Sequence, residues 1–368
     1  MRKIVVIAPK YNEKGSIENL VESIFKEQDK IPNWEISVLI VDSRSIDGTI
    51  ETVKKLQKKY RRLYLLETDK EGLGKAYLRA FKFCEEKLNP YLVIDIDADG
   101  QHDPTIIHQF IKKIEQGSDF VVGTRYAKGG SIPKNWALYR KILSIGASLV
   151  MRLGFMKLKI TDWTSGYRAI KFWLVKNAFD HIKNYSGYVF QIAFLDFAIK
   201  GNAVISEVPI QFKERKWGIS KINALQYIFQ SFLYVFSHSS FIKFFIVGLI
   251  GFVIDFGISY LGIDFFHNPV WLITILSTES AIISNFLLNN FWSFSHKRIE
   301  GSSGSFLLGF LKFNLVSSGS IAIQTGGMQI LVNIFGRKLW YLYKILIIAF
   351  IIIPYSYILY NKFVWKSK

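Results

Sequence analysis

The sequence is poor in cysteine: Cys84 is the only one among its 368 residues. A single cysteine cannot form an intramolecular disulfide, and it makes a metal site built from thiolates implausible. A secretory signal is also missing ahead of the first hydrophobic segment. We therefore expect the N-terminal part of the chain to stay on the cytosolic side of a membrane.

The sequence also lacks the marks of a nucleic-acid-binding protein, although its net charge is +18. It has no concentrated basic tail and no aromatic and basic pattern of the RNA-binding type. A basic protein that lies against anionic lipid headgroups explains the charge more simply. We expect a lipid bilayer as a partner, and no nucleic acid.

Hydrophobicity divides the chain into two parts. Residues 1 to about 236 mix charged and apolar side chains as globular α/β proteins do, whereas residues 241–365 contain four long apolar runs. These runs predict membrane-spanning helices. The predicted spans are about Phe241 to Gly262, Val270 to Phe291, Phe306 to Phe335 and Trp340 to Phe363. An even number of spans would return the C-terminus to the cytosol.

Polar residues interrupt the apolar runs. They are costly in lipid, so we expect them to pack inward between helices. Interhelical hydrogen bonding is the favoured explanation, and a path for a lipid-linked sugar is the alternative. The residues in question are Asp255, Glu279, Asn285, Asn314 and Gln324.

Strands alternate with helices in the first part, which predicts a doubly wound parallel sheet. The expected strands are Lys3 to Ala8, Glu35 to Val41, Leu63 to Glu67, Tyr91 to Ile96, Asp119 to Gly123 and Ala203 to Phe212. Ligands of such sheets bind beyond the carboxyl ends of the strands. Polar residues follow four of these strands, so we expect them along one edge: Glu13, Asp42, Asp97 with Asp99, and Arg125.

The densest group of acids follows the apolar run Tyr91 to Ile94. Asp95, Asp97 and Asp99 alternate there, and negative charge gathered at a strand end is costly without a cation. An acidic loop that only caps the next helix is the alternative, and we assign that role to Asp103. For Asp97 and Asp99 we favour a divalent metal, because capping does not require two carboxylates at this spacing.

Six motifs in the first part together resemble one family. They are Pro9-Lys10-Tyr11-Asn12-Glu13, Val41-Asp42 with Asp47-Gly48-Thr49, Gly72-Leu73-Gly74, Asp97-Ala98-Asp99-Gly100-Gln101-His102, Gly123-Thr124-Arg125-Tyr126 and Thr164-Ser165-Gly166-Tyr167-Arg168. The chain resembles the dolichyl-phosphate and polyprenyl-phosphate mannose synthases of glycosyltransferase family 2. The resemblance implies an α/β GT-A (Rossmann-like) catalytic domain, a nucleotide sugar donor and a lipid phosphate acceptor.

The resemblance also implies a division into domains. Residues 1–220 would form the GT-A domain, which includes an interface helix at about 137–156, and residues 221–240 would form a juxtamembrane interface helix. Residues 241–368 resemble the GtrA-like four-span membrane domain. Both interface segments have apolar residues at helical spacing, as in Leu138, Ile142 and Ile145, and could instead be core helices. Arg140 and Ser144 on the first segment favour the membrane interface.

On the donor side, the resemblance assigns Asp97 and Asp99 to Mg²⁺ or Mn²⁺ bound against the donor diphosphate, with Gln101 completing the site. Contacts to the nucleoside are implied for Pro9, Tyr11, Glu13 and Asp42. The segment 215–221 is similar to the mobile basic loop of the family. Its Arg215 and Lys221 would neutralise the leaving phosphates, and contact with lipid is the alternative interpretation.

On the acceptor side, the resemblance assigns the lipid phosphate to Arg125 and Arg140, with the hydroxyl of Ser144. Guanidinium groups suit phosphate because they offer paired donors. The acceptor is already an oxyanion, so a general base is unnecessary and the attack on C1 would invert that carbon. Asp196 is the remaining acid in a position to act as a base; we favour a buried structural carboxylate instead.

The sequence therefore predicts a metal-dependent, inverting enzyme that transfers mannose from GDP-mannose to dolichyl or polyprenyl phosphate at the cytosolic face of a membrane. Lys10 and Ser43 depart from the family pattern beside the nucleoside, which keeps UDP-glucose as an alternative donor. A flippase for lipid-linked sugar with an inactive soluble domain is the alternative from another class. The oligomeric state is not predicted.

Overall fold

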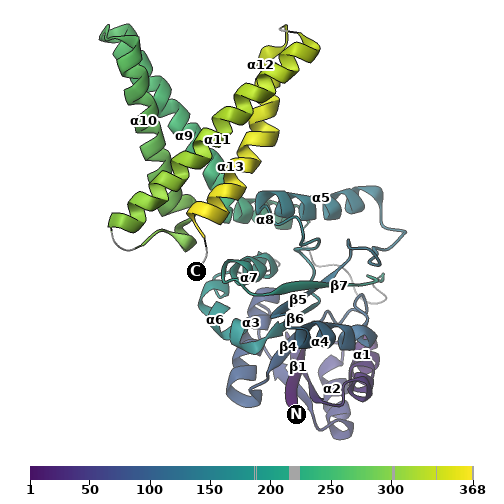
Figure 1. The fold of residues 1–368 in the computed structure, drawn as a ribbon. Helices are drawn as coiled ribbons and strands as arrows, with labels where there is room; N and C mark the ends of the chain where they lie inside the picture. The colour runs from purple at the N-terminus through teal and green to yellow at the C-terminus, as the bar shows by residue number, and fades with distance from the viewer. Residues whose placement is uncertain (186, 188, 215–223, 301–302, 337, 367–368) are drawn as a thin grey trace. The chain divides into compact units, whose positions relative to one another are not determined.

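The computed structural model describes residues 1–185, 187, 189–214, 224–300, 303–336 and 338–366. The chain divides into two compact units, Met1–Val235 and Phe236–Lys368 (Figure 1). Each unit is described by itself.

The first unit is built on a sheet of seven strands in the order β3-β2-β1-β4-β6-β5-β7. The strands are β1 (Arg2–Lys10), β2 (Trp34–Asp42), β3 (Leu63–Glu67), β4 (Leu92–Asp95), β5 (Phe120–Thr124), β6 (Arg168–Lys171) and β7 (Ile205–Pro209). The central strands are buried on both faces, which explains their unbroken apolar sequences.

The prediction of a wholly parallel sheet is wrong in one strand, because β6 runs antiparallel to both β4 and β5. The chain leaves β5 at the carboxyl edge of the sheet, forms α5 (Leu138–Gly154) and then re-enters the sheet from that same edge. Strand β6 must therefore run backwards. As a result, the loop before β6 lies at the edge where β1, β2 and β4 end.

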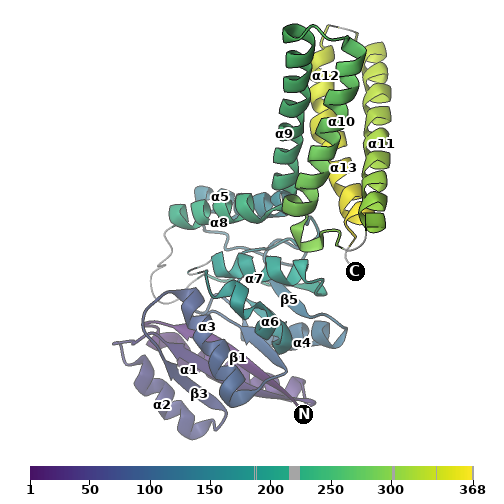
Figure 2. The ribbon, with the colours of Figure 1, turned by 90° about the vertical axis from the view of Figure 1, so that its left-hand side faces the viewer.

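Helices cover both faces of the sheet (Figures 1 and 2). On one face, α1 (Lys14–Lys26), α2 (Thr49–Lys59) and α4 (Ile107–Glu115) pack on the inward-facing aliphatic residues of β1, β2 and β4. On the other face, aromatic rings join the sheet to the helices: Phe194 of α7 (Val189–Lys200) packs edge-on against Phe120 and Phe81. The remaining helices of this face are α3 (Leu73–Phe83) and α6 (Phe172–Ile182).

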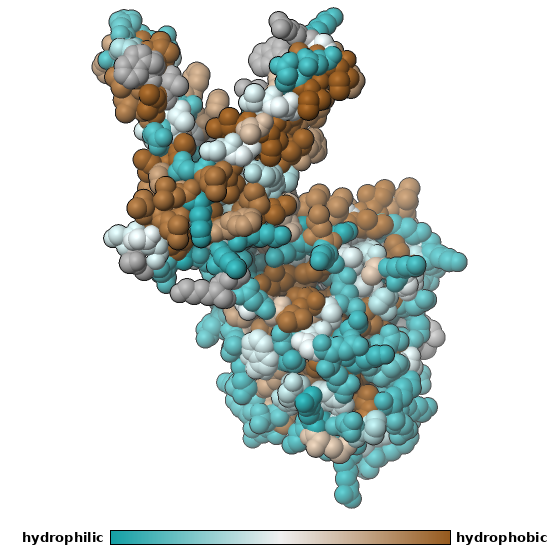
Figure 3. Space-filling model, in the orientation of Figure 1, coloured by the Kyte–Doolittle hydropathy of each residue, from teal (hydrophilic) through white to brown (hydrophobic). Residues whose placement is uncertain are grey.

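Helix α5 presents its apolar face outward, so it is not an ordinary core helix. Leu138 is 73% exposed and Ile142 is 60% exposed, and only Ser148 and Met151 of this helix are buried. Figure 3 shows hydrophobic side chains gathered along α5. Helix α8 (Ala224–His238) packs against α5 where Gly154 meets Val235.

The second unit consists of helices arranged in two groups, α9 with α10, and α11 with α12 and α13 (Figures 1 and 2). The bounds are α9 (Ser240–Tyr260), α10 (Val270–Leu288), α11 (Ser303–Phe335), α12 (Trp340–Ile347) and α13 (Ile353–Leu359). Within the described residues, three stretches are long and apolar enough to cross a membrane: Ser240–Phe265, Ser303–Phe335 and Ile345–Val364. Helix α10 is not among them, so its assignment as a fourth span stays a prediction.

Among the described residues, serines make three of the hydrogen bonds between helices of this unit. Ser259 donates to Ser277 at 3.0 Å, and Ser317 and Ser320 bond to Tyr360 and Ser356 at 2.7 and 2.8 Å. The expected polar residues contribute less. Asn314 donates to the carbonyl of Phe310 in its own helix. Glu279 is exposed, which contradicts its expected inward position, because it lies on the face of α10 opposite the buried Ser277.

We predict opposite effects for alanine at two glycines of the first unit. A Cβ on Gly123 in β5 would lie 3.0 Å from Ile210 and Phe110 side-chain atoms, so Gly123→Ala should destabilise the unit by about 1–3 kcal/mol through overpacking. A Cβ on Gly146 in α5 meets nothing within 4 Å, so Gly146→Ala should be neutral or stabilise by up to about 1 kcal/mol. The thermal midpoints of the solubilised full chain test both. Equal shifts in one direction would contradict this packing.

Candidate active site

The candidate site lies at the edge where β2, β1 and β4 end side by side. The register pairs Lys10 with Asp42, and it pairs Ile7 with Asp95. The turns after these strands carry the predicted donor-side residues. Strand β5, which precedes Arg125, is separated from β4 by β6, so the predicted acceptor residues begin two strands away.

The turns after β1 and β2 are tied together by hydrogen bonds. Asn12 adopts a positive φ of 56°, its backbone N–H donates to Ser45 Oγ at 2.8 Å, and its side-chain oxygen accepts from the Ile46 N–H at 3.0 Å. The Glu13 N–H donates to Thr49 Oγ1 at 3.3 Å. Among the predicted nucleoside residues, Pro9 pairs with Val41 in the sheet, and the ring of Tyr11 lies 4.1 Å from Lys70 Nζ.

Asp42 has the chemistry of a binding residue at the end of β2. Its side chain is fully buried, and Oδ1 accepts from the Ser45 N–H at 2.7 Å. Oδ2 has no hydrogen-bond partner among the described residues. A buried acceptor of this kind is normally satisfied, so Oδ2 fits a role in accepting a hydrogen bond from a ligand.

Lys10 places a cation inside this acidic edge. From the sequence, Lys10 was noted only as a departure from the family pattern. The side chain is buried, and Nζ donates to the Glu13 carbonyl at 3.1 Å and to Ser16 Oγ at 3.3 Å. Ser16 Oγ in turn donates to the Ala98 carbonyl at 2.6 Å. Burial lowers the pKa of Lys10 to about 8, although the neighbouring carboxylates oppose this shift. Lys10 therefore links the turn after β1 to the acidic turn after β4.

The acidic turn is held by its own side chains and by His102. Asp99 is buried and its Oδ1 accepts from the Gln101 N–H at 3.0 Å. His102 Nδ1 accepts from the Asp97 N–H at 3.0 Å, so this nitrogen carries no proton. Burial lowers the pKa of His102 to about 4, which agrees with a neutral ring. The approach of Nδ1 to Asp97 Oδ2 at 3.6 Å is therefore not an ion pair.

The residues of this turn fit a hard divalent cation. Asp97 and Asp99 offer carboxylate oxygens, and Asp97 is 35% exposed. Gln101 donates through Nε2 to the Lys213 carbonyl at 3.2 Å, which engages the nitrogen of its amide and leaves the oxygen as an acceptor. No group of three or more His, Cys, Asp and Glu residues suited to a metal occurs in the part of the chain that the structure describes. Two carboxylates suffice for Mg²⁺, which commonly completes its shell with water and substrate phosphate.

Asp95 and Arg168 are buried neighbours in the sheet behind this turn. They face one another in the β4–β6 register, and both are fully buried. Arg168 donates to the backbone carbonyls of Ser165, Trp163 and Gln191, while neither Asp95 oxygen has a hydrogen-bond partner among the described residues. Burial raises the pKa of Asp95, and the charge of Arg168 opposes that rise. Asp95 therefore lies inside the sheet, directly behind the acidic turn.

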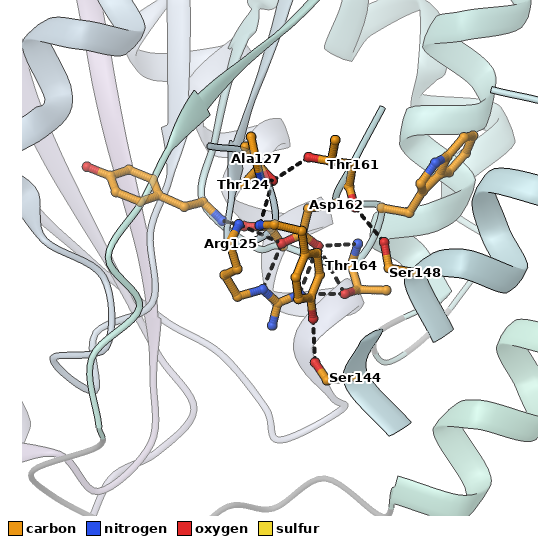
Figure 4. A network of polar contacts seen from close by, with 12 residues as sticks. Thr124, Arg125, Ala127, Ser144, Ser148, Thr161, Asp162 and Thr164 are labelled. Atoms are coloured by element: carbon orange, nitrogen blue, oxygen red, sulfur yellow. Dashed lines mark hydrogen bonds and ion pairs between the residues drawn. The ribbon is translucent and has the colours of Figure 1, made fainter. Parts of the chain in front are cut away.

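Arg125 is engaged by Asp162 in the loop before β6 (Figure 4). Nε donates to Oδ2 at 2.7 Å and Nη2 to Oδ1 at 2.8 Å, and Nη2 also donates to Thr164 Oγ1 at 2.7 Å. Burial alone would raise the pKa of Asp162, but the charge and hydrogen bonds of Arg125 hold it below its ordinary value. The pair is therefore ionised.

The other two predicted acceptor residues lie on α5. Ser144 shares a 2.6 Å hydrogen bond with the hydroxyl of Tyr126, which follows Arg125 in the chain (Figure 4). Arg140 is exposed, and its guanidinium lies 4.0 Å from the centre of the Trp136 ring. The Tyr126–Ser144 bond thus brings the end of β5 and the start of α5 together.

Two further acidic residues have structural contacts. Asp196 is buried and accepts from Lys200 Nζ at 2.7 Å and from the Tyr234 hydroxyl at 3.0 Å, which joins α7 to α8. Asp103 caps a short helix through the Thr105 N–H, as expected, but it also pairs with Lys213 at 2.7 Å. Its assignment as a cap alone was therefore incomplete. The predicted residues Arg215 and Lys221 lie outside the described residues.

Comparisons with known proteins identify the family of the chain. The family model described as glycosyl transferase family 2 matches residues 5–191, and the model described as GtrA/DPMS, transmembrane domain, matches residues 243–365. A dolichol-phosphate mannosyltransferase from Pyrococcus furiosus is 32% identical over 328 residues, which cover 87% of this chain and 88% of that protein. A polyprenol monophosphomannose synthase from Mycolicibacterium smegmatis is 33% identical over 60% of this chain and 82% of that protein.

Solved structures give a more distant likeness. Glucosyl-3-phosphoglycerate synthase from Mycobacterium tuberculosis matches with a TM-score of 0.47 and 17% identity over 64% of this chain and 80% of that one. Mannosyl-3-phosphoglycerate synthase from Rubrobacter xylanophilus matches with a TM-score of 0.46 and 16% identity over 64% of this chain and 73% of that one.

The family model and the Pyrococcus relative confirm the predicted family and its α/β GT-A fold. The predicted membrane domain is confirmed by the second model and by the three apolar helical stretches. The chain belongs to glycosyl transferase family 2 and carries a GtrA/DPMS transmembrane domain after its catalytic domain.

Proposed function

We propose that this enzyme transfers mannose from GDP-mannose to dolichyl or polyprenyl phosphate, with inversion at C1, at the cytosolic face of a membrane. One observation carries the proposal: Arg140 lies on α5, whose exposed face is apolar. A phosphate bound by Arg140 would thus sit level with a lipid surface on which α5 rests. The names of the relatives, which specify mannose and prenyl phosphates, support this choice.

On the donor side, Asp97, Asp99 and Gln101 would hold Mg²⁺ or Mn²⁺. When bound, the ion would neutralise the diphosphate and so favour departure of the nucleotide. The buried Oδ2 of Asp42 would accept a hydrogen bond from the nucleoside, beside Pro9, Tyr11 and Glu13. Roles for Arg215 and Lys221 at the diphosphate remain part of the proposal.

On the acceptor side, Arg125, Arg140 and the Ser144 hydroxyl would bind the lipid phosphate. A phosphate oxygen attacks C1 of mannose and forms the new C1–O bond. The bond from C1 to the donor phosphate breaks, and its electron pair leaves with GDP. No proton has to be removed from the attacking oxyanion, so a general base is not needed. Asp196 is already engaged by Lys200 and Tyr234, which supports its structural role.

We predict that the full chain in lipid nanodiscs with dolichyl phosphate and Mn²⁺ forms labelled lipid from GDP-mannose. Asp99→Ala should slow transfer about a hundredfold or more, because it removes a ligand of the ion that stabilises the leaving group. Asp180→Ala is the matched control, since this aspartate is 89% exposed on α6. Label from UDP-glucose alone would overturn the donor, and full activity of Asp99→Ala would overturn the metal site.

We predict that Arg140→Ala raises the KM for dolichyl phosphate about tenfold, because a charge-assisted contact to phosphate is lost. The KM for the donor should stay unchanged. Since Arg140 is exposed, added NaCl should raise the acceptor KM of the wild type more than that of the variant. Arg61→Ala removes an equal charge next to the amino end of β3 and serves as the control. Parallel losses of donor and acceptor affinity would indicate a folding role instead.

A further inference from the structure

The loop Thr161–Thr164 connects two elements that border the acceptor side, the end of β5 and helix α5 (Figure 4). Asp162 binds Arg125, which follows β5. The Thr161 carbonyl accepts from Ser148 Oγ of α5 at 2.6 Å. Thr161 Oγ1 shares a 2.6 Å hydrogen bond with Thr124 Oγ1, next to Arg125. The loop therefore holds the end of β5 and the interface helix in a fixed relation.

Asp162 accepts hydrogen bonds from two nitrogens of the Arg125 guanidinium and so prevents this group from rotating. Its two oxygens bind Nε and Nη2, its Oδ2 also accepts the Arg125 backbone N–H at 3.1 Å, and it is fully buried. A guanidinium held on one edge can offer a ligand only the donors of its other edge. The pair is neutral overall, so Arg125 would contribute orientation, whereas the exposed Arg140 would contribute charge.

Glu207 on β7 lies behind Asp162 and holds its backbone. Its Oε1 accepts from the N–H groups of Thr161 and Asp162 at 2.7 and 3.2 Å, and its Oε2 accepts from Thr161 Oγ1 at 2.8 Å. Burial raises the pKa of Glu207, although the hydrogen bonds from Thr161 oppose this shift. Without Glu207, the two backbone donors would lose their acceptor in a partly buried position, where an unmet hydrogen bond is costly.

We infer that Glu207 and Asp162 act in series as positioning residues for the acceptor phosphate, with Glu207 holding the loop that carries Asp162 and Asp162 orienting Arg125. The inference rests on the proposed function, because it takes Arg125 as a phosphate-binding residue. Glu207 does not belong to any of the six family motifs identified in the sequence. The competing explanation is a purely structural role, in which Glu207 only stabilises the contact between β7 and the loop; we call this the structural staple. It predicts different results for the variants described below.

The decisive comparison is Glu207→Ala with Glu207→Gln in the full chain. A glutamine can keep Oε1 as acceptor for both N–H groups and donate through Nε2 to Thr161 Oγ1, whose own proton then turns to Thr124 Oγ1. Glu207→Ala should therefore raise the KM for dolichyl phosphate about tenfold while the KM for GDP-mannose changes less than about twofold. Glu207→Gln should restore the acceptor KM to within about threefold of the wild type.

A double variant tests the series arrangement. Asp162→Asn should raise the acceptor KM at least as much as Glu207→Ala, because the added amide N–H opposes an Arg125 donor. Combining the two should raise it no further than Asp162→Asn alone, since both act through the same guanidinium. If the fold-increases in acceptor KM of the two single variants multiply in the double variant, the inference is overturned. It is also overturned in favour of the structural staple if the donor and acceptor KM values rise together and the thermal midpoint falls.

The positioning role can be tested separately from the proposed reaction. If the wild type transfers no sugar to dolichyl phosphate, the affinities of the detergent-solubilised wild type and of Glu207→Ala for dolichyl phosphate can still be compared. Weaker binding by Glu207→Ala would support the positioning role of Glu207 and Asp162 even if the enzyme does not catalyse this reaction. Equal binding, or no binding by the wild type, would overturn it.

Discussion

Charge that is buried at one edge of the sheet must be compensated within the protein, and the chain does so in a different way at each strand. Lys10 extends beneath the turn that carries Asp99, and Arg125 is bound by Asp162. Asp95 lies opposite Arg168 in the β4–β6 pair, and burial raises its pKa, which favours the uncharged acid. An isolated buried charge costs several kcal/mol, whereas a paired and hydrogen-bonded one is tolerated. The edge can therefore carry several carboxylates and guanidinium groups on a single sheet.

The reversed strand β6 is what brings these pairs together. It starts at the carboxyl edge, so its first residue, Arg168, lies opposite Asp95, and the preceding loop places Asp162 beside Arg125. Because the chain forms α5 between β5 and this loop, the same excursion supplies the exposed apolar helix and Arg140. A buried scaffold and a surface that suits lipid thus come from one connection of the fold.

Much of this arrangement follows from the sequence, because apolar runs that end in acids are strong local signals. The strands before Glu13, Asp42 and Asp97 were predictable for this reason, and so was the family. Strand β6 was not, since its four residues begin with a charged Arg168, and one of the carbonyl groups that allow its burial belongs to Gln191, 23 residues away in the chain. Glu207 gave no signal either: its role exists only because β7 pairs with β5 and brings it to Thr161.

Lys10 illustrates how such long-range contacts change the chemistry of a motif. In the sequence it is one departure within Pro9-Lys10-Tyr11-Asn12-Glu13, whereas in the structure its ammonium group is buried among Glu13, Asp42, Asp47 and Asp99. A cation fixed there offsets part of the charge that a divalent metal would otherwise neutralise, and it repels that metal as well. The acidic turn of this enzyme is therefore less dependent on a bound ion for its folding than its carboxylates suggest.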